Sequence, residues 1–188
     1  TARALVEAGA DAVKLEGGTA MLPQVNAIIG AGIPFIGHIG MLPQHVLEEG
    51  GKYRIKGRDD AGHAKLLDDA AALAEAGAFA VVLELVTPAV AKEITERFPF
   101  ATIGIGSGPY LDGQVLVYHD LLGMMQHPWH AAHVLKFCKM YASVGSAINV
   151  ALAEYRDEVR NGQFPAMKFS PYQITAEEEE LFMQRLSD

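Results

Sequence analysis

The sequence contains a single cysteine, Cys138, so it has no internal disulfide framework. This scarcity is typical of proteins in the reducing cytoplasm, where we expect this one. Long apolar runs are also lacking, since none reaches the roughly 18 residues that a membrane-spanning helix needs. Basic residues are outnumbered: 15 Lys and Arg stand against 23 Asp and Glu, which gives a net charge of -8. Such a surface repels nucleic acid and anionic membranes, and we expect neither as a partner.

The 188 residues are 50% hydrophobic, which is enough for one sizeable core, and we expect one domain over residues 1–188. The chain begins at Thr1, and residues 2–8 already have the composition of a helix. We therefore expect this start to lie inside a larger domain.

A repeated unit organises the first half of the chain. Three times a glycine-containing turn follows a helical stretch and leads into a short β-rich run, with the glycine available for a left-handed helix C-cap. Two more apolar runs follow, and the five predicted strands are residues 11–15, 33–37, 79–83, 101–105 and 114–118. Apolar strands that alternate with helices predict a parallel sheet covered by helices.

Five such strands at this spacing favour an α/β fold of the (β/α)₈ TIM-barrel type over a doubly wound sheet. A full barrel usually needs about 250 residues, so about three N-terminal βα units are expected to be missing. After the fifth strand we expect a C-terminal helical extension, with helices near residues 131–142 and 145–161. A capping box formed by Thr175 and Glu178 predicts the start of another helix.

Ionisable side chains stand where the first three predicted strands end. Glu16 and Glu84 each lie seven residues after a turn glycine (16 − 9 and 84 − 77), and His38 lies six after one (38 − 32). Lys14 precedes Glu16 by two and shares its face of the strand. Active sites of (β/α) barrels lie at the carboxyl ends of the strands, so these four residues are the candidate site.

The residue types allow more than one interpretation. Lys14 and Glu16 suit an anionic substrate and a divalent metal, or they form a structural ion pair. Glu84 follows an apolar strand, so it has a polar partner, binds a metal or serves as a general base. His38 either donates a hydrogen bond to a substrate oxygen or is a hydrogen-bonded structural group.

Three other segments carry weaker signals. Residues 39–59 lack periodicity, and a long loop at the catalytic end is often a lid or a binding loop. The glycine-rich residues 104–108 suit either phosphate binding or close approach of the backbone to a ligand. His127, His130 and His133 have a spacing that mimics a metal site, but surface histidines are the favoured interpretation because no carboxylate or cysteine cluster is near them.

Several motifs together resemble the ketopantoate hydroxymethyltransferase family. Residues 13–18 (Val-Lys-Leu-Glu-Gly-Gly) are similar to its Lys-x-Glu-Gly-Gly motif, and residues 37–44 (Gly-His-Ile-Gly-Met-Leu-Pro-Gln) to its Gly-His-x-Gly-Leu-x-Pro-Gln stretch. The remaining matches follow in the family's order up to about residue 165, at residues 50–58, 76–84, 103–108, 112–117 and 119–123.

The resemblance implies a barrel of the phosphoenolpyruvate/pyruvate type and a metal-assisted reaction. Mg²⁺ would chelate 3-methyl-2-oxobutanoate, a glutamate would remove its C3 proton, and the enolate would attack 5,10-methylenetetrahydrofolate to give 2-dehydropantoate. On matching positions, Glu84 would be the base and Glu16 would support the metal. Lys14 and His38 would bind the substrate. The resemblance also implies a homodecamer of two pentameric rings.

The match has departures and leaves rival functions open. The family's two metal-binding aspartates and a substrate-binding serine have no counterpart here, and family members usually have alanine where Ser107 stands. One rival is another keto-acid C–C lyase or mutase of the same barrel superfamily, which should lack the Gly-His-x-Gly loop. The other is a non-catalytic fragment or assembly subunit.

Overall fold

The computed structural model describes residues 1–48, 50–125, 136–170 and 174–186. These residues fall into two compact units. The first unit consists of residues 1–118 and 134–139, and the second of residues 119–133 and 140–188. The single domain that the sequence suggested over residues 1–188 stays a prediction.

A five-stranded parallel sheet forms the centre of the first unit, with its strands in the order β1-β2-β3-β4-β5. The strands are β1 (Val13–Glu16), β2 (Phe35–Gly40), β3 (Ala80–Glu84), β4 (Ala101–Ile105) and β5 (Gly113–Gln114). The predicted parallel α/β sheet is therefore confirmed. The turn glycines before the first three strands, Gly9, Gly32 and Gly77, all have positive φ, as expected for left-handed helix ends.

The fifth strand is much shorter than predicted, and residues 115–118 are not part of it. Its pairing with β4 matches Ile103 with Gly113 and Gly104 with Gln114. One residue beyond Ile105, Gly106 turns the chain with a φ of +64°. The partner strand therefore ends, and residues after Val115 have no ladder to extend. The strand predicted over residues 114–118 was therefore wrong in its length, because β5 extends only as far as β4 pairs with it.

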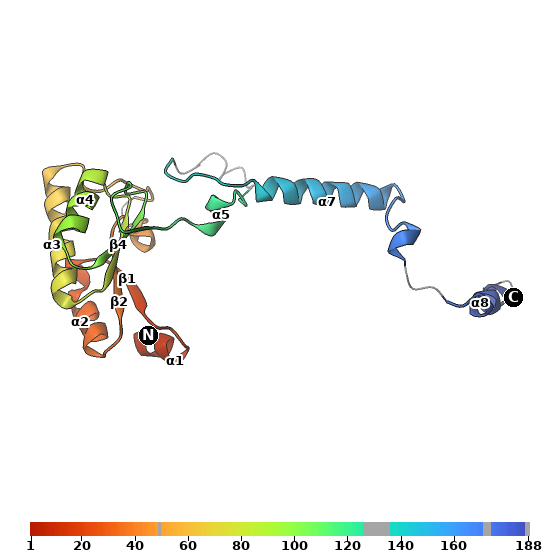
Figure 1. Ribbon diagram of the computed structural model, residues 1–188, viewed down its shortest axis with the longest axis horizontal. Coiled ribbons are helices and arrows are strands. Elements are labelled where there is room, and N and C mark those ends of the chain that lie inside the picture. Colours follow the sequence, from red (N-terminus) through yellow and green to blue (C-terminus); the bar gives the residue numbers. More distant parts are fainter. Residues whose placement is uncertain (49, 126–135, 171–173, 187–188) are drawn as a thin grey trace. The chain divides into compact units, whose positions relative to one another are not determined.

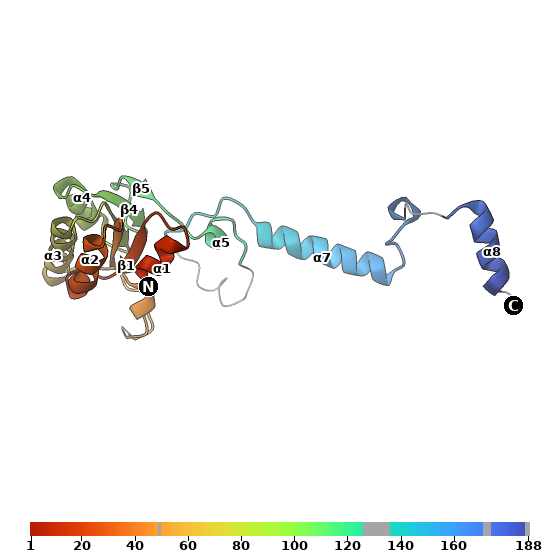
Figure 2. The same cartoon turned by 90° about the horizontal axis from the view of Figure 1, so that it is seen from below.

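Helices cover one face of the sheet. Helices α2 (Leu22–Gly30), α3 (Asp60–Ala76) and α4 (Pro88–Arg97) lie together on the same side of the strands (Figures 1 and 2). Asp59 caps α3, because its side chain accepts a hydrogen bond from the Gly62 backbone N–H at 2.7 Å. The core between helices and sheet is apolar and closely packed, and includes Val25, Phe35, Leu73, Val81, Leu83 and Ile94.

The opposite face of the sheet carries the residues that alternate with this core. Ile36, Val82 and Ile103 point there and are half-buried, whereas Phe35, Val81 and Thr102 on the helix side are buried. At the carboxyl end of the strands this second face carries Glu16, His38 and Glu84. The remaining helical elements of the unit are α1 (Ala2–Glu7), η1 (Thr19–Met21) and η2 (Pro43–His45).

The second unit is helical. It contains most of α5 (Tyr118–Leu121), then α7 (Val144–Arg160), η3 (Met167–Phe169) and α8 (Ala176–Leu186). The helix predicted over residues 145–161 is confirmed by α7. Residues 136–142, the described part of the helix predicted near residues 131–142, are not helical, and residues 131–135 lie outside the described residues. Thr175 also caps α8 as predicted, since its hydroxyl accepts a hydrogen bond from the Glu178 N–H at 3.3 Å. Within the described ranges, no helix has both the length and the apolar character that crossing a membrane takes.

Candidate functional site

The carboxyl ends of β1, β2 and β3 bring the ionisable residues of the first unit together. The strand register pairs Glu16 with His38 and Gly40 with Glu84. Residues paired across parallel strands point to the same face, so Glu16, His38 and Glu84 all lie on the face away from the helices. Lys14, two residues before Glu16, lies on this face as well.

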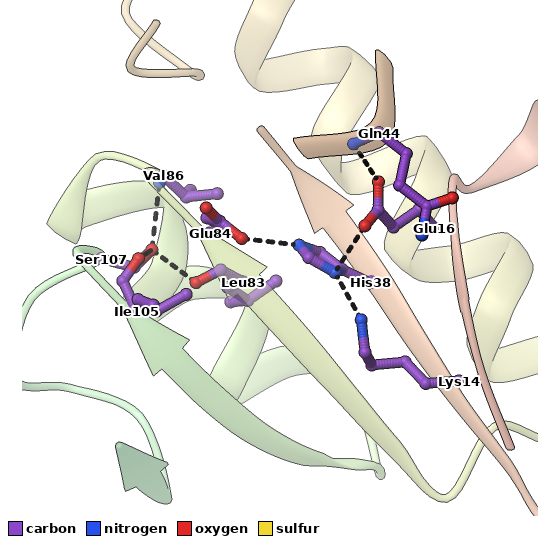
Figure 3. Close-up of polar contacts among 9 residues, drawn as sticks. All are labelled: Lys14, Glu16, His38, Gln44, Leu83, Glu84, Val86, Ile105 and Ser107. Atoms are coloured by element: carbon purple, nitrogen blue, oxygen red, sulfur yellow. Dashed lines mark hydrogen bonds and ion pairs between the residues drawn. The ribbon is translucent and has the colours of Figure 1, made fainter. Parts of the chain in front are cut away.

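His38 is the central residue of this group, and its side chain is only 4% exposed. One ring nitrogen, Nδ1, lies 3.1 Å from Lys14 Nζ and 4.0 Å from Glu16 Oε1. The other, Nε2, lies 3.2 Å from Glu84 Oε2 (Figure 3). The four predicted site residues therefore gather around one imidazole.

The contacts select one tautomer of His38. A lysine ammonium carries donors only, so His38 Nδ1 accepts the hydrogen bond from Lys14 Nζ. A neutral imidazole then carries its proton on Nε2, which faces Glu84. This buried Nε2 makes no aligned hydrogen bond to any described residue, despite its 3.2 Å separation from the carboxylate. A small rotation of the Glu84 side chain, or an oxygen atom of a bound ligand, would give this Nε2–H a hydrogen-bond acceptor.

The long loop after β2 is attached to both carboxylate-bearing strands. Near its start, the Gln44 N–H donates to Glu16 Oε2 at 3.1 Å. Near its end, Lys56 N donates to Leu85 O at 2.8 Å, and Thr87 N donates to Lys56 O at 3.1 Å. The loop predicted over residues 39–59 thus lies at the site, although β2 takes its first two residues. Its role as a lid or binding loop stays a prediction.

Glu84 sits at the point where β3 turns. Its backbone carbonyl accepts a hydrogen bond from Met41 N at 2.8 Å. This approach requires Gly40, because a Cβ at that position would lie 2.3 Å from Glu84 O. The next residue, Leu85, has a φ of +50°, which is uncommon for any residue but glycine. Main-chain contacts, and not the side chain alone, therefore hold Glu84 at the site.

Sequence reasoning assigned no structural role to two residues near the site. Asp69 on α3 is 5% exposed and accepts hydrogen bonds from Thr19 N, Thr19 Oγ1 and Lys65 Nζ at 2.8–2.9 Å. It holds the turn that follows Glu16, and the Cβ of any residue replacing Gly18 would lie 2.4 Å from its Oδ1. The sequence signal that could have revealed Asp69 is its position on the apolar side of a helix, because a buried carboxylate there needs polar partners.

The second missed residue is Ser107, which is fully buried. Its hydroxyl donates to Leu83 O at 2.7 Å and accepts from Val86 N at 3.0 Å (Figure 3). The neighbouring Gly106 packs against the chain itself, since a Cβ there would lie 2.8 Å from Leu85 Cδ2. These contacts favour internal packing for residues 104–108; phosphate binding there stays a prediction.

One carboxylate of the site is placed to receive a cation. Glu16 is 8% exposed, and its Oε1 accepts no hydrogen bond from the described residues, whereas Oε2 is bonded to Gln44. Mg²⁺ is commonly held by one or two carboxylates together with water and substrate oxygens, so Glu16 fits such a role. Across the described residues, no three His, Cys, Asp or Glu side chains form a group that could hold a metal. His127, His130 and His133 lie outside the described residues.

Comparison with known proteins gives a consistent result. A family model described as ketopantoate hydroxymethyltransferase matches residues 1–167. A 3-methyl-2-oxobutanoate hydroxymethyltransferase named as mitochondrial, from Arabidopsis thaliana, is 53% identical over 98% of this chain and 53% of its own length. The Moorella thermoacetica protein of the same function name is 52% identical over 89% of this chain and 60% of its own.

A further relative with this function name, from Oryza sativa, is 48% identical over 98% of this chain and 50% of its own length. The chain thus spans about half the length of the curated relatives it matches. A solved structure of a proposed lyase/mutase from Burkholderia cenocepacia J2315 covers 97% of this chain and 62% of its own. Its identity is 17% and its TM-score is 0.40.

Proposed function

The chain belongs to the ketopantoate hydroxymethyltransferase family, and we propose that it carries the catalytic residues of a 3-methyl-2-oxobutanoate hydroxymethyltransferase. The proposed reaction removes the C3 proton of 3-methyl-2-oxobutanoate and joins C3 to the one-carbon unit of 5,10-methylenetetrahydrofolate. Water supplies the hydroxyl oxygen, and 2-dehydropantoate and tetrahydrofolate are the products. This is a step of pantothenate biosynthesis.

The observation that carries the proposal is the group of Lys14, Glu16 and Glu84 around His38. Removing a proton beside a carbonyl needs a base, a positive charge near the developing enolate oxygen and a group that orients the base. Glu84 supplies the carboxylate base, and Lys14 supplies a cation for the substrate's carboxylate or keto oxygen. The His38 Nε2–H lies against Glu84 and is available to a substrate oxygen. Each role is thus assigned to a residue already within reach of the others.

Glu16 is the proposed residue for Mg²⁺, because its Oε1 is the carboxylate oxygen left without a hydrogen bond from the described residues. When bound, Mg²⁺ would polarise the keto group and so acidify the C3 proton. The Gln44 N–H, bonded to Oε2, fixes the carboxylate so that Oε1 points away from the loop. Glu16 is therefore held in one orientation before any ligand arrives.

The open face of the sheet supports a (β/α)₈ barrel as the complete fold. Ile36, Val82 and Ile103 are apolar and only half-buried on the face that carries the site. In a barrel such residues fill the interior, packed against strands that close the cylinder. Additional βα units would bury this face and surround the site.

An assembly of several copies is also part of the proposal. Along α7, Ile148, Leu152, Tyr155 and Val159 recur at helical spacing and are 45–60% exposed. Such a stripe suits a helix that packs against another chain, and the family resemblance implies a homodecamer of two pentameric rings. We place the protein in the cytoplasm on its cysteine usage; the Arabidopsis relative is named as mitochondrial.

A second candidate is a non-catalytic chain of the same family. It is favoured by one observation: the described residues offer Glu16 but no group of three potential metal ligands. The lyase or mutase alternative loses its support, because the Gly-His-x-Gly loop is present and the matching relatives carry the hydroxymethyltransferase name.

Proton exchange at C3 distinguishes the two candidates. The purified protein is incubated in D₂O with 3-methyl-2-oxobutanoate and Mg²⁺, and loss of the C3 proton signal is followed by ¹H NMR. We expect exchange well above a protein-free control and its loss when EDTA removes the metal. No exchange above that control would sink the catalytic proposal and leave the non-catalytic one.

A further inference from the structure

The backbone immediately after Glu84 is held in an unusual conformation. Leu85 has a φ of +50° and is 9% exposed, so a branched, buried side chain occupies the left-handed region. Residues in this region persist only when the surrounding structure holds them there. The orientation of Glu84 therefore depends on what fixes Leu85.

The hydroxyl of Ser107 bridges the two sides of this strained point. It donates to Leu83 O at 2.7 Å and accepts from Val86 N at 3.0 Å, the residues that flank Glu84 and Leu85 (Figure 3). The backbone of Leu85 is bonded in addition to Ile105 O at 2.9 Å and to Lys56 N at 2.8 Å. Among these contacts, the one made by Ser107 is the only one supplied by a side chain.

The segment is closely packed on both sides. Gly106, beside Ser107, has no room for a side chain because Leu85 Cδ2 and Phe137 Cδ1 would lie 2.8 and 2.9 Å from its Cβ. On the opposite side, Gly40 lies against Glu84 O. A change in the hydrogen bonding of Ser107 would therefore be transmitted to residues 84–86 and not absorbed by empty space.

We propose that Ser107 is a positioning residue for Glu84: its hydroxyl clamps Leu83 to Val86, and the clamp aims the Glu84 carboxylate at His38. The inference rests on the proposed function, in which Glu84 is the base. Ser107→Ala removes the hydroxyl and keeps the Cβ, so this substitution asks whether the chain depends on that hydroxyl.

The first measurement does not need activity. Amide hydrogen exchange of residues 84–87 is compared in the wild-type protein, Ser107→Ala and the matched control Thr102→Val. Thr102 is also fully buried, and its hydroxyl bonds to Thr95 Oγ1 and Asp112 Oδ2 at 2.9 Å, at the other end of β4. We expect Ser107→Ala to speed exchange at Leu85 and Val86 by about tenfold or more, and Thr102→Val to leave these amides unchanged.

The second measurement is the kinetics of C3-proton exchange. We expect Ser107→Ala to lower kcat about 10–100-fold with KM within about twofold of wild type, because a misplaced base affects the transition state more than substrate binding. Thr102→Val should keep the wild-type kcat. If Ser107→Ala fails to fold, the nearly isosteric Ser107→Cys, with a weak donor and acceptor, should shift both readouts in the same direction.

The outcomes separate this inference from the proposed function. A wild-type protein without C3 exchange removes the proposed function, while the amide measurement still decides whether the clamp exists. Wild-type amide exchange at residues 84–87 in Ser107→Ala overturns the clamp. Faster amide exchange with an unchanged kcat, or an equal loss of kcat in Thr102→Val, overturns the positioning role.

Discussion

Glu84 Oε2 lies 3.2 Å from His38 Nε2, and the two residues stand on neighbouring parallel strands, β3 and β2. Lys14 approaches the other nitrogen of the same ring, at 3.1 Å. One imidazole thus separates the site's cation from the carboxylate proposed as its base.

Replacing the carboxylate tests the base. Glu84→Gln should slow C3-proton exchange about 10²–10⁴-fold, because glutamine nearly preserves the shape but cannot accept the proton. Binding of the keto acid and Mg²⁺ should remain, as measured by calorimetry on the same variant. Exchange at the wild-type rate with saturating Mg²⁺ and keto acid would falsify the role of Glu84, and His38 would be the next candidate.

The tautomer of His38 gives a test that is independent of turnover. In the wild-type protein at neutral pH, ¹⁵N NMR of the imidazole should show Nε2 protonated and Nδ1 unprotonated, because Lys14 donates to Nδ1. Lys14→Met should shift the ring toward a mixture of tautomers and raise KM for the keto acid about tenfold or more, as a cation for the substrate is lost. Lys14→Arg serves as the comparison that keeps the charge. An unchanged spectrum in Lys14→Met would contradict the assignment.

Glu16 should govern metal dependence. Glu16→Gln is expected to raise the Mg²⁺ concentration needed for half-maximal C3 exchange about 10–100-fold, since an uncharged amide is a weaker ligand for a hard cation. Glu48→Gln removes a carboxylate that is 75% exposed on the nearby loop and should leave the Mg²⁺ curve in place. Equal curves for Glu16→Gln and wild type would show that the metal is held elsewhere.

Asp112 gives the fold a pH dependence away from the site. Hydrogen bonds from the Thr102 backbone N–H and then from its hydroxyl hold the pKa of the Asp112 carboxyl below its usual range. A depressed folded-state pKa contributes stability that is present above the unfolded pKa of about 3.9 and is lost as pH falls through the folded value. Denaturant unfolding at pH 6 and pH 3 should therefore show a smaller pH effect in Asp112→Asn than in wild type. Identical pH effects would exclude this contribution.

The sequence by itself determined the position of the first four strands, their parallel arrangement and the ionisable residues at the ends of the first three. In the first three βα units a turn glycine lies three or four residues before the strand, and parallel strands end at one edge of the sheet. Local position was therefore sufficient to bring Lys14, Glu16, His38 and Glu84 together. The motifs around them also sufficed to identify the family.

The tertiary structure alone decided the features that depend on partners distant in the chain. β5 ends early because the chain turns at Gly106, just after its partner strand β4. The residues of β5 do not reveal this limit. Asp69 holds the turn after Glu16 across 50 residues, and Ser107 clamps the Glu84 segment across 21 and 24 residues. The tautomer of His38 likewise follows from Lys14 on the next strand. Periodicity and motifs report which face a residue occupies, whereas the hydrogen-bond partner of a buried polar group is set by how separate elements pack.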